Sequence, residues 1–109
     1  MPRLGRLHIP GGCYHVMGRG LERRNIFDSD DDKQDFIDRL GDSVKNSDAR
    51  CLAWALMSNH YHLLIRVGTK PLSQMMSPLL TGYAIKYNRR HYPSGYVFQN
   101  RFKSVLCAH

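Results

Sequence analysis

Residues 58–67, with the sequence SNHYHLLIRV, constrain the fold most because their side chains suit a strand with two different faces. Successive side chains of a β-strand point to opposite sides of the sheet. One side would hold His60, His62, Leu64 and Arg66, and the other Tyr61, Leu63, Ile65 and Val67. The apolar residues 51–57 predict a second strand just before it, and Ser58-Asn59 would form a tight hairpin turn.

Two histidines separated by one residue suggest a site for a metal ion. On a strand, His60 and His62 would lie about 7 Å apart on the same face, and neutral imidazole is the commonest protein metal ligand. The spacing is common, so a pair of surface or nucleic-acid-facing histidines without an ion stays open. His15 would add a third nitrogen ligand if its strand neighbours residues 58–67, and a structural role for it is the alternative.

The charge of the chain is distributed very unevenly. The formal net charge is +7, yet eight of the nine acidic residues lie between Asp28 and Asp48, and none follows. Such a basic chain favours a polyanionic partner, most commonly nucleic acid, although a merely basic soluble protein is the alternative. An individual basic residue could instead be a solvated cation of a loop, or a cation that stabilises the end of a helix, without contacting DNA. The candidate DNA contacts are Arg19, Arg23, Arg24, Lys86, Arg89, Arg90, Arg101 and Lys103.

The length of 109 residues predicts a single small domain with one two-layer core. No apolar run approaches the ~20 residues of a membrane span, and the basic start lacks an apolar signal core. Three cysteines without a C-x-x-C spacing favour a cytoplasmic protein with reduced, buried thiols. We therefore expect one cytoplasmic domain over residues 1–109, in which residues 1–12 form an extended basic arm.

The predicted elements follow the order β-α-β-β-α-β. Residues 13–18 suit the first strand, and residues 32–45 suit a helix with an acidic outer face. A second amphipathic helix follows Pro71, with a kink expected at Pro78, and residues 96–99 and 103–107 suit short strands. This order matches a split βαβ, ferredoxin-like or RRM-like α+β fold, with an antiparallel sheet and two helices on one face. The hairpin would lie near the centre of the sheet.

Five short motifs occur in a fixed order along the chain. They are YHVMGRG from Tyr14, MSNHYHLLI from Met57, LTGYA from Leu80, YNRRH from Tyr87 and VFQNRFKS from Val97. Together they resemble the single-tyrosine HUH transposases, in particular the REP-associated tyrosine transposases and their insertion-sequence relatives. The resemblance covers residues 14–107, and it implies a transposase that cleaves and rejoins single-stranded or hairpin DNA, commonly as a homodimer.

The same resemblance implies roles for individual residues. His60 and His62 would hold Mg²⁺ or Mn²⁺, which polarises the scissile phosphate, and a tyrosine would attack phosphorus to form a phosphotyrosine link. In the family this tyrosine lies on a helix after the segment that matches residues 101–107, whereas the sequence ends at His109. We therefore expect weak or absent cleavage, unless Tyr83 or Tyr87 substitutes. Both lie on an apolar helix stripe, which favours a core role.

A non-catalytic, basic, RRM-like nucleic-acid-binding module is the alternative function. RRM-like domains stack bases on aromatic residues of the sheet. This chain places histidines on the corresponding strand, which favours the transposase.

Overall fold

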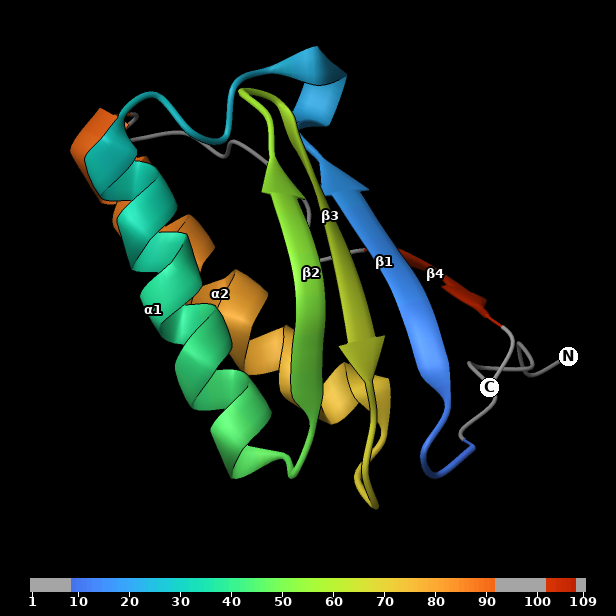
Figure 1. The fold of residues 1–109 in the computed structure, drawn as a ribbon. Coiled ribbons are helices and arrows are strands. Elements are labelled where there is room, and N and C mark those ends of the chain that lie inside the picture. The colour runs from blue at the N-terminus through green and yellow to red at the C-terminus, as the bar shows by residue number, and fades with distance from the viewer. Residues whose placement is uncertain (1–8, 92–101, 108–109) are drawn as a thin grey trace, which may run out of the picture.

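The computed structural model describes residues 9–91 and 102–107, which form a four-stranded sheet with two helices on one face (Figure 1). The strands are β1 (Cys13–Arg19), β2 (Arg50–Leu56), β3 (His60–Arg66) and β4 (Lys103–Leu106). Their order across the sheet is β2-β3-β1-β4, and each neighbouring pair is antiparallel. The helices are α1 (Asp30–Asn46) and α2 (Leu72–His91), and a short 3₁₀-helix, η1 (Leu21–Arg23), follows β1. The predicted split βαβ fold is confirmed.

The sequence predicts that the hairpin of β2 and β3 lies near the centre of the sheet, and only one of its two strands does. Only β3 is central, where it pairs with both β1 and β2, whereas β2 forms one edge. The crossover through α2 returns the chain to the far side of β1, so β4 forms the other edge. β1 and β3 therefore have neighbours on both sides, and they form the most strongly constrained part of the sheet.

α2 continues through Pro78 as one helix. Proline removes one intrahelical hydrogen bond, which leaves the carbonyl of Gln74 without its usual donor. Both residues are solvent-exposed, so water can satisfy this carbonyl. Neither α1 nor α2 has the length and apolar character that a membrane crossing requires. The predicted strand 96–99 lies outside the described residues.

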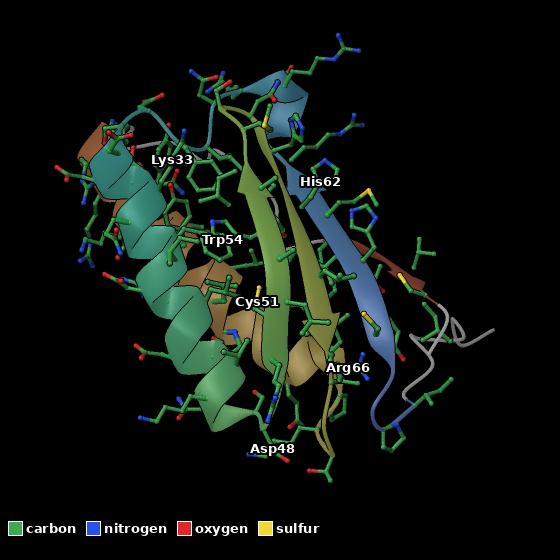
Figure 2. The ribbon with its side chains drawn as sticks, in the orientation of Figure 1. Lys33, Asp48, Cys51, Trp54, His62 and Arg66 are labelled. Carbon is green, nitrogen blue, oxygen red and sulfur yellow. The ribbon has the colours of Figure 1, made fainter. Side chains whose placement is uncertain are left out.

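A β-bulge changes which residues of β2 share a face. Cys51 pairs with Ile65 and Ala53 pairs with Leu64, so Leu52 is an extra residue in the strand. One extra residue moves the side chains that follow it to the opposite face. Cys51 and Trp54 therefore both lie on the side of β2 toward α1 (Figure 2). Trp54 is nevertheless 57% exposed, because β2 is an edge strand.

The apolar core lies between the sheet and the helices. β1 contributes Val16, and β3 contributes Tyr61, Leu63 and Ile65, all almost completely buried. The helices cover them with apolar side chains at spacings of three and four: Phe36, Leu40, Leu72, Met75, Met76, Leu79, Leu80, Tyr83 and Tyr87. Because strand residues alternate, the next residues of β1 and β3 face away from both helices. This open face carries all three candidate metal histidines.

A buried carboxylate joins the start of α1 to the end of α2. Ser29 caps α1 by accepting a hydrogen bond from the backbone N–H of Asp32, and the Asp32 carboxylate accepts one from the backbone N–H of Asp28. The same carboxylate, only 1% exposed, pairs with Arg90 and with His91. Asp32 is therefore both part of the helix cap and the partner of two bases on α2.

Gly18 is required by the ring that packs on it. It lies directly opposite Tyr61 in the β1–β3 register, and a Cβ at Gly18 would overlap the Tyr61 ring and hydroxyl. We expect Gly18→Ala to lower the free energy of unfolding by about 1–3 kcal/mol, the usual cost of overpacking. Urea denaturation measures it.

Gly41→Ala is the matched control for this substitution. Gly41 lies within α1, and a Cβ there would meet no atom within 4 Å. Alanine should raise stability by about 0.5–1 kcal/mol, because glycine is unfavourable inside a helix. Equal effects of the two substitutions would contradict this account of Gly18.

Candidate metal centre and nucleic-acid interface

Three histidines meet on the open face of the sheet, near the end where β1 stops and β3 begins. Met17 lies opposite His62 in the register and Arg19 lies opposite His60, so His15 is diagonal to His62. Nε2 of His15 lies 3.0 Å from Nδ1 of His62, and the two rings stack with centroids 5.2 Å apart. The rings of His60 and His62 are nearly perpendicular, with centroids 5.1 Å apart. The predicted convergence of the two β3 imidazoles is thus present.

Asn59 orients the first of these imidazoles, although its place in the sequence predicts only a turn residue. Its side-chain oxygen lies 2.8 Å from Nδ1 of His60. An amide oxygen can only accept, so this contact requires a hydrogen on Nδ1 of His60, and in the neutral imidazole Nε2 then carries the lone pair. The proximity in sequence of Asn59 to His60 was the available signal. Only the turn conformation shows that the two side chains meet.

The environment of His62 favours the neutral form of its imidazole. Burial lowers the pKa of His62, and the neighbouring His15 and His60 lower it further, since each disfavours a second positive charge. A metal ligand must be unprotonated. His62 therefore stays in the unprotonated form, which can bind an ion, down to a lower pH than an ordinary histidine does.

The described residues offer two candidate nitrogen donors for a metal ion, from His60 and His62. Within residues 9–91 and 102–107, no group of three His, Cys, Asp or Glu side chains is arranged so that all three could hold one ion. His60 and His62 can offer two nitrogen ligands, which suits a transition-metal ion such as Mn²⁺ better than Mg²⁺, which prefers oxygen. His15, predicted as a possible third ligand, directs Nε2 at His62 instead.

Backbone hydrogen bonds hold the turn that precedes His60. The N–H of Gly20 donates to the carbonyl of Asn59 at 2.9 Å, while those of Ile26 and Phe27 donate to the carbonyl of Ser58 at 2.7 and 3.1 Å. Residues 20–27 therefore pack along the hairpin turn. This contact fixes the backbone from which both Asn59 and His60 project.

Tyr83 and Tyr87, the candidate substitute nucleophiles, support this loop from the core. The Tyr83 hydroxyl donates to the carbonyl of Ile26, and the Tyr87 hydroxyl donates to that of Asn25 at 3.2 Å. Both side chains are 1% exposed. Burial raises the pKa of Tyr83, and the nearby Asp32 carboxylate raises it further. A buried phenol that is already a donor is a poor nucleophile, so the geometry gives both residues a structural role.

The candidate DNA contacts divide into two groups. Arg19 lies on the open face opposite His60, and Arg23 and Arg24 lie in and just after η1 at the same end of the sheet (Figure 1). On the helical side, Lys86 pairs with Asp35 at 3.5 Å, and Arg90 pairs with Asp32.

Of the remaining three candidates, two lie within the described residues. Arg89 is exposed on α2, and the backbone of Lys103 pairs with that of Met17. Arg101 lies outside the described residues. Lys86 and Arg90, by contrast, pair with carboxylates of α1, which makes them less available to phosphates than Arg19.

Arg50 and Arg66 form a pair of cations that is not among the DNA contacts predicted from the sequence. They lie directly opposite each other on β2 and β3, on the face that carries His62. Both are exposed, and among the described side chains neither has an acidic partner. Like charges directly opposite destabilise a sheet, so this pair favours an anionic ligand. Arg66 is four residues, about 13 Å, from His62 along the strand.

A family model described as "Transposase IS200 like" matches residues 10–108 of the chain. Solved structures with the same fold include a REP-associated tyrosine transposase bound to a REP hairpin, with a TM-score of 0.68 and 15% sequence identity. That match covers 100% of this chain and 64% of the other, so the chain spans less than two thirds of that protein.

A second similar structure is a Deinococcus radiodurans R1 protein assigned as a transposase, with a TM-score of 0.70 and 15% identity. That match covers 97% of this chain and 86% of the other. At this identity both structures support the fold alone. No curated protein matches the sequence.

Tyr83→Phe tests the structural role of the Tyr83 hydroxyl. We expect a loss of about 1 kcal/mol at neutral pH, because one buried hydrogen bond is removed. The raised pKa of Tyr83 also predicts how stability depends on pH. Above about pH 10, Tyr83 of the unfolded chain ionises while that of the folded chain stays protonated, so wild-type stability falls as pH rises. Urea denaturation at pH 8 and pH 10.5 should show less alkaline loss in the variant than in the wild type. An equal loss would contradict this account.

Proposed function

The chain belongs to the family of IS200-like transposases, and on that premise we propose that it holds a divalent metal ion and single-stranded DNA on the open face of its sheet. The proposed reaction is cleavage and strand transfer through a phosphotyrosine link. The observation that supports it most directly is the arrangement of His60 and His62. Each has its Nδ1 within hydrogen-bond distance of a neighbouring side chain, which leaves Nε2 available for an ion.

His60 and His62 would supply the protein nitrogen ligands of the ion. When bound, the ion would polarise the scissile phosphate and stabilise the charge that develops there. Two protein ligands leave several coordination positions for phosphate oxygens and water. Imidazole donors favour Mn²⁺ over Mg²⁺ in this site.

The DNA would lie across the open face, where its phosphates meet cations at both ends of β3. Arg19 lies beside His60, and Arg50 and Arg66 lie at the other end. The similar REP-associated transposase binds a REP hairpin, and hairpin DNA is the ligand that we propose here. The homodimer implied by the family resemblance stays a prediction. RRM-like base stacking has less support, because the described residues of this face include no Phe, Tyr or Trp.

The nucleophilic tyrosine would come from outside the described residues. The four tyrosines of the described part are all at most 3% exposed, and they lie on the helical side of the sheet: Tyr14, Tyr61, Tyr83 and Tyr87. The histidines lie on the opposite side. A phenolic oxygen that attacks a phosphate held at His60 and His62 must reach the open face, which these four side chains do not.

Replacing both His60 and His62 by alanine tests the metal site. We expect Mn²⁺ affinity to fall by more than about 100-fold, because loss of outer-shell partners alone commonly costs 10–100-fold. The electron paramagnetic resonance signal of free Mn²⁺ measures it without DNA. Binding of a labelled hairpin in EDTA should change little, because the cations of the face remain.

His91→Gln is the control for this double substitution, since it removes a histidine from the helical side. Equal Mn²⁺ binding by the double variant and the wild type would refute the metal site. If the wild type binds Mn²⁺ but does not bind the hairpin, the proposed DNA interface is refuted. A covalent protein–DNA band on a denaturing gel that is lost in the double variant would demonstrate the cleavage step.

Replacing both Arg50 and Arg66 by alanine tests the open face as the DNA interface. If each arginine contacts one phosphate, the slope of log affinity against log salt for a single-stranded oligonucleotide should become shallower by about 1.4. Lys45→Ala removes an exposed cation from α1 and should leave the slope unchanged. An unchanged slope in the arginine double variant would place the DNA elsewhere.

A further inference from the structure

We infer that His15 is a positioning residue, which fixes the tautomer and orientation of His62 and does not itself bind the ion. The inference rests on the proposed metal site, because it concerns how one ligand of that site is prepared. It differs from the prediction that His15 is a third ligand. It assigns His15 to the outer shell of the site.

The contact between the two rings is specific in its atoms. Nε2 of His15 lies 3.0 Å from Nδ1 of His62, so one of these nitrogens carries the hydrogen that lies between them. If His62 binds an ion through Nε2, its hydrogen must be on Nδ1. Nε2 of His15 then accepts that hydrogen, and His15 carries its own on Nδ1.

His60 shows the same arrangement with a different partner. Asn59 accepts from Nδ1 of His60 at 2.8 Å, as His15 would accept from Nδ1 of His62. Each ligand histidine would therefore have one acceptor behind it. Metal-bound histidines almost always donate their second N–H to such a partner, which fixes the ring and strengthens it as a ligand.

The position of His15 in the sheet suits a rigid partner. β1 is a central strand, and the backbone of His15 pairs with Leu64 on one side and with Val105 on the other. The His15 ring also stacks on that of His62 with an interplanar angle of 25°. A group held by two neighbouring strands can keep a ligand within the narrow range of orientations that a metal site needs.

The geometry also argues against His15 as a direct ligand in this arrangement. The nitrogen that would have to face the ion already faces His62. Turning it toward an ion would break the contact with His62 and leave the hydrogen on Nδ1 of His62 without this acceptor. The positioning role uses the observed contact without any change.

Three variants test this inference by Mn²⁺ binding alone. His15→Phe keeps a flat ring but has no acceptor, and we expect Mn²⁺ affinity to fall by about 10–100-fold. His15→Gln places an amide oxygen near the former Nε2, so it should recover much of that loss. Met17→Leu changes the side chain opposite His62 without altering the contact with His15, so its affinity should match the wild type.

A second measurement separates positioning from general damage to the fold. Two-bond ¹H–¹⁵N spectra of ¹⁵N-histidine-labelled, metal-free protein at pH 8 report which nitrogen of His62 carries its hydrogen. In this metal-free state, wild type and His15→Gln should show the hydrogen on Nδ1 of His62, and urea denaturation should show all variants folded. A folded His15→Phe with wild-type Mn²⁺ affinity would overturn the inference.

The outcomes distinguish this inference from the proposed function. If the wild type binds no Mn²⁺, the metal site fails and the role of His15 fails with it. If the wild type binds Mn²⁺ and His15→Phe binds it equally well, only the role of His15 fails. If His15→Phe and His15→Gln lose affinity as completely as the His60 and His62 double variant, His15 is a direct ligand and the positioning role is refuted.

Discussion

The antiparallel pairing of β1 with β3 is the contact on which the rest of this structure depends. Its register places Gly18 under the Tyr61 ring on the helical side and brings His15 against His62 on the open side. A shift of one residue would exchange the two faces, placing histidines in the core and aromatic rings in solvent. The packing of the core and the candidate metal site therefore rely on the same set of backbone hydrogen bonds.

The described residues of the helical layer support the candidate site, although none of the candidate ligands comes from them. The hydroxyls of Tyr83 and Tyr87 hold the carbonyls of residues 25 and 26, and the loop that contains these residues donates to the turn before His60. Asp32, with Arg90 and His91, joins the same ends of α1 and α2. The basic end of α2 thus has a structural function, while the cations of the open face remain for an anionic ligand.

Several features were predictable because they depend on local pattern. Alternation placed His60 and His62 on one face of β3, and spacings of three and four placed Tyr83 and Tyr87 on the apolar stripe of α2. Other features depend on pairing between distant segments. The bulge at Leu52, the opposition of Arg50 and Arg66, and the ion pair of Arg90 with Asp32 each join residues whose proximity no local pattern encodes.

The sequence by itself determined the order of the elements, the two faces of β3 and the motifs that indicate the transposase family, since these follow from residue type and periodicity. The tertiary structure decided which groups face the histidine nitrogens. His15 and His62 are 47 residues apart in the chain, and their contact at 3.0 Å exists only because β1 and β3 pair in this register. Hydrogen bonds require atoms to meet within a few tenths of an ångström, a condition that the packed sheet meets and that sequence spacing cannot specify.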